Sequence, residues 1–194
     1  MIVGHYASAL WARSRDPRGP FALFLACAIL QDAAWLALAA LGYEPTLPAS
    51  VLDASFRKVS VEMTFSHDLV SASGWMLIAG TIGLFATRRW QTALLCCALS
   101  FGHEVLDLAC GFAHHVAGPT TRSIGFNLYG NAPYLAILLE AAFGALMVAL
   151  YGRSEARRGR PLSRHTRMRL VAVFVVGALV ALPGAERSFH DWMG

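Results

Sequence analysis

Residues 90–110 read WQTALLCCALSFGHEVLDLAC, and this stretch decides how the chain folds. Its length and apolar composition suit a helix that crosses a membrane, which needs about 20 such residues. Near its end the stretch carries His103, Glu104 and Asp107. Ionisable side chains inside a membrane are costly, so they mark a functional site by default.

The rest of the chain has the same apolar character. Hydrophobic residues make up 56% of it and charged residues only 14%, whereas a soluble domain is roughly a quarter charged. Further runs long enough to cross a membrane lie at about 21–42, 65–87 and 132–151, with a shorter one at about 169–184. The sequence therefore predicts an all-α protein, a polytopic transmembrane helix bundle of about five spans. We expect one integral membrane domain over residues 1–194, with a short half-helix over residues 1–12.

Arginines in the connections indicate the orientation of these spans. They occur before the first predicted span (Arg13, Arg15, Arg18), between the second and third (Arg88, Arg89), and in the arginine-rich loop 152–168. Basic connections alternate with cation-poor ones, so the positive-inside rule places them and the N-terminus in the cytoplasm and the C-terminus outside. The net charge of +4 thus indicates contact with membrane lipids and not with nucleic acid. The apolar N-terminal stretch precedes its basic residues, unlike in a signal peptide.

Three other features complete this outline. The amphipathic segment 43–64 predicts a short helix lying on the outer surface. Residues 111–131 contain Gly, Pro and Asn and predict an irregular outer loop. The four cysteines show no Cys-x-x-Cys spacing, which favours packing roles over disulfides; they are Cys27, Cys96, Cys97 and Cys110.

Depth along the predicted spans brings the polar residues to a common level. At 1.5 Å of rise per residue, His103 lies about 21 Å from Arg89, and Asp107 about 27 Å. Asp32 lies about 21 Å from Arg18 by the same count. His67 then falls about 31 Å from Arg88, near the outer rim, and His5 about 12 Å deep if the half-helix enters from the cytoplasm. These side chains share a band from the middle to the outer third of the membrane.

Their chemistry in that band points to a cation. His103 and Asp107 are four residues apart and share one helix face, while Glu104 points about 100° away. No lysine or arginine occurs inside a predicted span, so a bound cation is the natural partner for the carboxylates. Histidine and carboxylate together are ligands that zinc accepts. The neighbours Ser66, His67 and Asp68 are not expected to form a catalytic relay, because adjacent residues of a helix diverge.

Several short motifs carry a resemblance to known membrane proteins. They are GHYASAL, LACAILQDAAW, FSHDLV, FGHEVLDL and SIGFNLYGNAPYLAILLE. The chain resembles a group of small bacterial integral membrane proteins, which are similar in turn to the YdjM-type inner-membrane, metal-dependent hydrolases. The resemblance covers roughly residues 1–151. It implies a bacterial inner-membrane location and a divalent metal, with zinc expected, held by two or three of His5, Asp32, His67, His103 and Asp107.

The chain departs from that pattern at two places. Gly111 stands where the relatives carry a histidine, and His114 and His115 stand where an acid is expected. Asp68 follows His67 in the place of a serine. These changes imply either an altered metal affinity or a protein that has kept the shape without the chemistry.

Three functions remain open from the sequence. The first is a hydrolase whose metal activates water near the outer leaflet, with Glu104 or Asp32 as general base and a lipid-borne ester or phosphoester as substrate. The second is a permease-like or proton- or cation-conducting protein, with a homo-oligomer supplying a missing half. The third is a non-catalytic scaffold whose polar side chains only join helices. Glu140 is expected to be a neutral acid bridging helices. His114 and His115 are expected to be plain loop residues, with the alternative that they complete a metal shell from the outer side.

Overall fold

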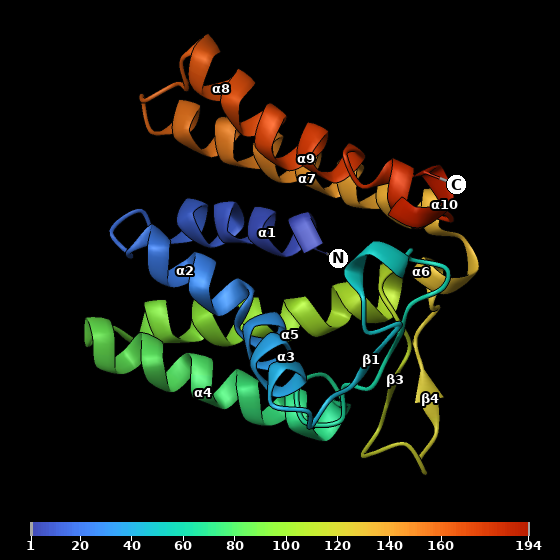
Figure 1. The fold of residues 1–194 in the computed structure, drawn as a ribbon. Helices are drawn as coiled ribbons and strands as arrows, with labels where there is room; N and C mark the ends of the chain where they lie inside the picture. The colour runs from blue at the N-terminus through green and yellow to red at the C-terminus, as the bar shows by residue number, and fades with distance from the viewer. Residues whose placement is uncertain (1, 194) are drawn as a thin grey trace.

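The computed structural model describes residues 2–193, and it is a bundle of helices with short strands at one end (Figure 1). Four helices in it are long and apolar enough to cross a membrane, and a bent pair makes a fifth if it counts as one span. The predicted fold class is therefore confirmed. The long helices are α4 (Leu69–Thr87), α5 (Trp90–Cys110), α7 (Pro133–Arg157) and the run Arg164–Gly184.

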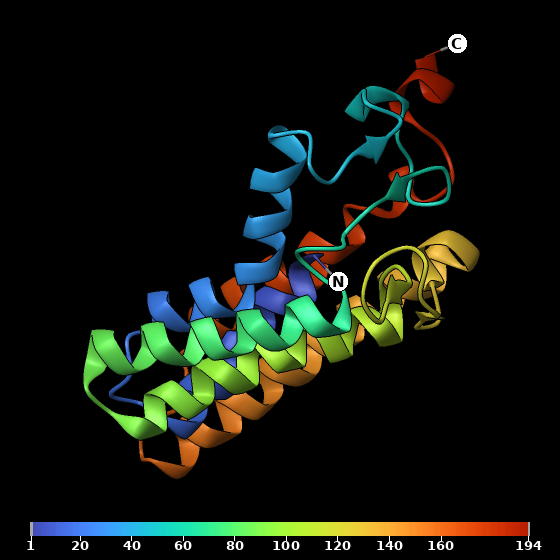
Figure 2. The same cartoon turned by 90° about the horizontal axis from the view of Figure 1, so that it is seen from below.

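The N-terminal part of the chain contains a half-helix and a broken helix. Helix α1 (Ile2–Arg15) has 14 residues, which give about 21 Å of length and cannot cross a hydrocarbon core about 30 Å thick. It packs against α7, α2 and α5, as the predicted half-helix requires. The expected continuous span 21–42 is instead α2 (Phe21–Ala28) and α3 (Leu30–Ala40), bent by 54° at Ile29. Figure 2 shows α3 leaving the layer of long helices.

Helices α4 and α5 form a tight antiparallel pair because small residues line their contact. A Cβ atom added at Gly80 would collide with Cys97 Sγ, and one at Gly83 would lie 2.9 Å from Cys96 Sγ. Such close backbone approach is what holds helices together where lipid surrounds them. All four cysteines are free and lie within the bundle, as their spacing predicts.

The C-terminal span differs in detail from its prediction. Helix α7 continues to Arg157 instead of ending near residue 151, and the next helical run begins at Arg164 instead of residue 169. That run consists of α8 (Arg164–Val171), a π-helical turn (Ala172–Val176), α9 (Gly177–Leu179) and a 3-10 turn (Leu182–Gly184), followed by α10 (Phe189–Met193). It packs on α7 at Gly144, where any side chain would collide with the backbone of Phe174.

Short hairpins cover the end of the bundle opposite the arginine-rich turns. Strand β1 (Thr46–Leu47) pairs with β2 (Ser60–Val61), and β3 (His114–His115) pairs with β4 (Ser123–Ile124), both antiparallel. The helical pieces in the segments that carry these hairpins, 43–64 and 111–131, are the 3-10 turn Val51–Asp53 and α6 (Leu128–Asn131). The predicted surface helix in segment 43–64 is therefore wrong, because that segment forms a short β-hairpin with turns and one 3-10 turn. The irregular loop at 111–131 is largely confirmed.

The three arginine-bearing connections meet at one end of the bundle, as Figure 1 shows for the turns α1–α2, α4–α5 and α7–α8. Asp16 joins two of them by accepting from both Arg89 guanidinium nitrogens, at 2.9 and 3.0 Å, and from Thr92 Oγ1 at 2.7 Å. Burial alone would raise the pKa of Asp16, but the Thr92 hydrogen bond and the Arg89 guanidinium outweigh it and lower the pKa. Arg158 also donates to the carbonyl of Ser14. The alternation of loop charges thus correctly predicted which turns share an end.

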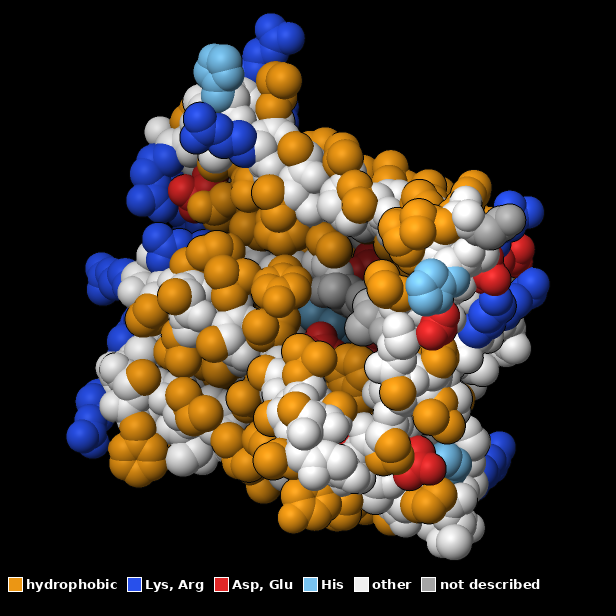
Figure 3. Space-filling model, viewed as in Figure 1, with side chains coloured by type: hydrophobic (Ala, Val, Ile, Leu, Met, Phe, Trp, Pro, Cys, Tyr) orange, Lys and Arg blue, Asp and Glu red, His pale blue; other side chains and the backbone are white. Residues whose placement is uncertain are grey.

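Large apolar side chains cover the outside of the long helices (Figure 3). Leu77 and Phe85 of α4 are 64% and 67% exposed, and Val180 in the last span is 72% exposed. A surface this apolar is unfavourable in water but suits contact with lipid. The chain is therefore a candidate multi-pass membrane protein whose polar groups are turned inward.

Candidate metal centre

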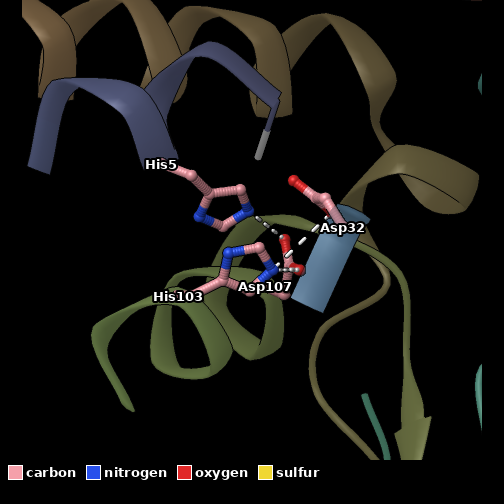
Figure 4. A group of neighbouring side chains, drawn as sticks. All are labelled: His5, Asp32, His103 and Asp107. Carbon is pink, nitrogen blue, oxygen red and sulfur yellow. Dashed lines mark hydrogen bonds and ion pairs between the residues drawn. The ribbon is translucent and has the colours of Figure 1, made fainter. Parts of the chain in front are cut away.

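A buried group of histidines and aspartates lies where three helical segments meet. His5 comes from α1, Asp32 from α3, and His103 with Asp107 from α5, and Figure 4 shows their side chains pointing toward one another. Each offers a ligand atom, and these atoms all lie within 4.8 Å of one another. His5, His103 and Asp107 are at most 6% exposed. This group could hold a metal ion.

His67, which precedes α4, reaches the same point. Its Nε2 lies 3.1 Å from His103 Nε2, 3.5 Å from Asp32 Oδ1 and 3.7 Å from Asp107 Oδ2. His103 Nε2 lies 3.6 Å from the same Asp32 oxygen and 3.4 Å from the same Asp107 oxygen. All five residues that the sequence nominated as ligands therefore lie together.

The spacing of these atoms matches a tetrahedral shell. The Nε2 atoms of His67 and His103 lie 3.1 Å apart, and each lies 3.4–3.7 Å from one oxygen of Asp32 and one of Asp107. Four ligands at about 2.0–2.1 Å from one zinc ion stand about 3.3–3.4 Å apart at the corners of a tetrahedron. His67, His103, Asp32 and Asp107 thus present donor atoms at the distances that such an ion requires.

The broken helix orients His103. The last carbonyls of a helix lack intrahelical donors, and that of Ala28, at the end of α2, accepts from His103 Nδ1 at 2.8 Å. A carbonyl can only accept, so Nδ1 carries the proton, and Nε2 of the neutral ring presents a lone pair to the cluster. The bend at Ile29 therefore both fixes the tautomer of His103 and directs Asp32 toward it.

A buried chain of hydrogen bonds orients His67 in the same way. The Ser66 hydroxyl donates to Glu44 Oε2 at 2.7 Å and lies 2.8 Å from His67 Nδ1. Because the hydroxyl proton goes to the carboxylate, the hydroxyl oxygen accepts from His67 Nδ1–H, which leaves a lone pair on Nε2. Ligating histidines are commonly fixed by such a partner on the other ring nitrogen. When both rings are neutral, the lone pairs of His67 Nε2 and His103 Nε2 therefore face each other at 3.1 Å.

The turn before α4 corrects one expectation and confirms another. Residues 66–68 precede the first residue of α4, Leu69, so the helical divergence of neighbours does not apply to Ser66 and His67, which are in contact. Asp68 does point elsewhere, accepting from His115 N at 2.9 Å and Gly118 N at 2.6 Å. It thereby fixes the β3–β4 loop instead of completing a relay.

Asp68 and its loop bring His114 to the site. The His114 ring stacks on that of His67, with centroids 5.2 Å apart. Burial lowers the pKa of His114 to about 4, and its Nε2 has no hydrogen-bond partner in the described part of the chain. His114 is thus a buried residue in contact with His67 and with the cavity, and its role in the site stays a prediction.

Glu140 of α7 holds α1, and with it His5, in place. Its Oε1 accepts from the backbone N–H groups of Val3 and Gly4, and its Oε2 accepts from Tyr129 Oη at 2.9 Å. An acid is favourable at a helix N-terminus, where N–H groups lack intrahelical partners. His5 Nε2 in turn lies 3.1 Å from Asp107 Oδ1, the carboxylate oxygen opposite the one that faces His67. The bridging role predicted for Glu140 is confirmed as a contact between α1, α7 and the loop before α7.

Glu104 lies to one side of this group, as its position on α5 predicts. Its Oε2 lies 3.4 Å from Gln31 Nε2, and Gln31 is itself 3.4 Å from Ser100 Oγ. Glu104 is 4% exposed, and its other oxygen has no partner among the described residues. The proposed base role of Glu104 stays a prediction, since the geometry turns this acid toward Gln31.

A cavity of about 390 Å³ adjoins the cluster. Asp32, His67, Asp107 and His114 line it together with aromatic side chains, namely Trp35, Phe56, Phe112 and Tyr129. Figure 3 shows a hollow near the middle of one face, with acidic and histidine side chains in its depth and apolar side chains at its rim. An ion in the cluster would therefore have one side open to a ligand, as catalytic metal sites do.

Sequence reasoning missed Glu44, Ser66 and the function of Gly111. Glu44 is fully buried although it lies in a loop, and a lone loop acid gives no local sign of burial. At Gly111 a Cβ atom would lie 2.6 Å from Asp107 Oδ1, so a side chain there would displace that carboxylate. Gly111, which stands where the resembling proteins carry a histidine, thus leaves room for the Asp107 carboxylate.

Removing the Ser66 hydroxyl tests whether it orients His67. We expect Ser66→Ala to lower the affinity for zinc by about 10–100-fold, the usual effect of losing a partner of a ligating histidine. Metal titration of the purified protein measures this. Ser73→Ala is the matched control, because the Ser73 hydroxyl is exposed and bonds only Leu69 O of its own helix. Equal affinities in the two variants would contradict the role of Ser66.

Comparisons of the chain with family models, with curated proteins and with solved structures find no match. The family resemblance of the short motifs therefore stays an expectation. What the molecule itself presents is a helical protein with four to five candidate membrane spans and a buried His/Asp cluster.

Proposed function

We propose that this protein is a membrane-embedded, metal-dependent hydrolase acting on a lipid-borne ester or phosphoester. The observation that carries the proposal is the pair of imidazole lone pairs, on His67 Nε2 and His103 Nε2, that face each other at 3.1 Å beside two carboxylates. Lone pairs at that distance repel unless a proton or a cation lies between them. A divalent cation held by His67, His103 and Asp107 would satisfy these lone pairs and leave the fourth position, beside Asp32, for water, and zinc fits both the donor set and the spacing.

The residues divide into roles by their placement. His67, His103 and Asp107 are the buried ligands in this proposal, and His5 orients Asp107 through its other carboxylate oxygen. Asp32, whose side chain is 29% exposed, lies beside the open position that faces the cavity. We assign Asp32 to proton transfer as general base, because it is the carboxylate most accessible to an entering substrate. A bound zinc ion would supply Lewis acidity and a water of lowered pKa.

The cavity favours a substrate that is mostly apolar with one polar group. Its volume of about 390 Å³ lies within the usual range for ligand pockets, about 300–1,000 Å³. Among its lining residues, Trp35 Nε1, Thr46 Oγ1 and His114 Nε2 have no hydrogen-bond partner in the described residues. Buried polar atoms are costly without partners, so we assign them to the ester or phosphoester group. The apolar rim in Figure 3 suits entry of acyl chains from the bilayer.

The positive-inside rule supplies the orientation of this proposal. With the arginine-bearing turns in the cytoplasm, the hairpins and the cavity face the outer leaflet of the membrane. A pure scaffold is disfavoured by the same lone pairs, since groups that only join helices pair donors with acceptors.

Metal removal tests the proposed activity. Purified wild-type protein in detergent is assayed on 4-nitrophenyl butyrate and on bis(4-nitrophenyl) phosphate, before and after treatment with a chelator. We expect hydrolysis of at least one probe, its loss on chelation and its return with zinc, because the metal supplies the activated water. A metal-loaded protein that hydrolyses neither probe, but shows metal-dependent cation flux in proteoliposomes, would favour the permease-like alternative.

A further inference from the structure

A second cavity, of about 510 Å³, lies at the arginine-rich end, between α1 and α7. Arg15 of α1 lines it together with three arginines from the end of α7 and the turn after it, namely Arg153, Arg157 and Arg158. Figure 3 shows basic side chains gathered along this edge of the molecule. Of the His/Asp cluster, only His5 lies on a helix, α1, that also lines this cavity.

Only one of these four charges is neutralised within the protein. Arg158 Nη1 lies 3.0 Å from Glu155 Oε1, and Arg158 also donates to Ser14 O. The side chains of Arg15, Arg153 and Arg157 have no hydrogen-bond or acidic partner among residues 2–193. All four arginines are exposed, and their like charges converge on one cavity, so they repel one another. An anion in the cavity would remove that cost.

We propose that this cavity binds the phosphate of an anionic phospholipid headgroup. Guanidinium groups bind phosphate oxygens through paired, charge-assisted hydrogen bonds, which suits a phosphodiester better than a diffuse charge. The lining also includes Trp11 and Leu150. Tryptophan is typical of the level at which headgroups meet hydrocarbon, and Leu150, which is 37% exposed, continues the apolar surface of α7. A phospholipid whose phosphate is bound at this level has its acyl chains beside α7. Inorganic phosphate cannot make that apolar contact.

The proposal is independent of the hydrolase function, because the cavity shares no residue with the metal centre. It also gives the arginines of this turn a role beyond setting the topology. Anionic lipid bound here would fix α1 to α7, and α1 carries His5 at its other end.

Lipid-dependent thermal stability of the purified full chain tests the proposal. The protein in a neutral detergent is titrated with phosphatidylglycerol, with phosphatidylcholine, or with inorganic phosphate at the same phosphate concentration. We expect phosphatidylglycerol alone to raise the melting temperature at low concentration. The double variant Arg153→Gln/Arg157→Gln should weaken the apparent affinity for this lipid by about tenfold or more, through the loss of two charge-assisted contacts.

The matched control is Arg164→Gln/Arg169→Gln, which removes the same two charges from exposed positions of α8 outside the cavity. We expect this control to bind phosphatidylglycerol within about twofold of wild type. In detergent without anionic lipid, the cavity variant should be at least as stable as wild type, because it relieves repulsion. Equal weakening by the two double variants would overturn the proposal in favour of a diffuse basic surface. Equal stabilisation by inorganic phosphate and phosphatidylglycerol would overturn the assignment to a lipid.

Discussion

His103→Ala is expected to lower the metal affinity of the purified protein by about 10²–10³-fold. His103 Nε2 lies within 3.6 Å of donor atoms on His67, Asp32 and Asp107, so its loss removes the ligand closest to the whole set. Zinc sites with four ligands bind with apparent free energies of about 10–16 kcal/mol, so one ligand accounts for about 2.5–4 kcal/mol, or about 10²–10³ in affinity. Elemental analysis by mass spectrometry measures the ions per chain.

The control for this result is His165→Ala, which removes an exposed histidine of α8. We expect that variant to retain the wild-type metal content. Thermal unfolding separates loss of metal from loss of fold, because chelation should lower the melting temperature of wild type but not that of His103→Ala. Wild-type protein without bound metal, or equal metal in wild type and His103→Ala, would remove the proposed centre.

Asp32→Asn is expected to lower kcat by about 10²–10⁴-fold, the usual contribution of a general base. The amide keeps an oxygen donor and nearly the same shape, so metal at saturating concentration should still bind. Measuring kcat on the most reactive probe, with the protein held saturated in zinc, separates proton transfer from metal loss. The proposal thus predicts a large effect on kcat from a change of one oxygen to one nitrogen.

Two further variants serve as a control for Asp32→Asn and as a test of the alternative base. Asp53→Asn alters an exposed acid that pairs with His190 and does not line the cavity, and it should leave kcat unchanged. Glu104→Gln changes the acid that faces Gln31. If Glu104→Gln loses activity while Asp32→Asn keeps it, the base is Glu104, and the assignment to Asp32 is wrong.

The residues of the candidate site could be predicted from the sequence, but the contacts that orient them could not. Depth along each helix placed His5, Asp32, His67, His103 and Asp107 in one band, because the rise per residue depends only on the backbone. Depth says nothing of rotation about the helix axis or of what a loop folds over. Glu44 and His114 reach the site through the folded loops before α4 and after α5, so no local pattern announced them.

The sequence by itself predicted the approximate number of candidate spans, the turns that share an end and the class of the fold, a bundle of apolar helices. These follow from hydropathy and charge, which are local and additive along a chain. Only the tertiary structure decided that the first span breaks at Ile29, that Ala28 and Ser66 fix two histidine tautomers, and that their lone pairs meet. Those outcomes depend on packing between segments up to 75 residues apart in the chain, where each side chain's direction is set by neighbours that its own sequence does not contain.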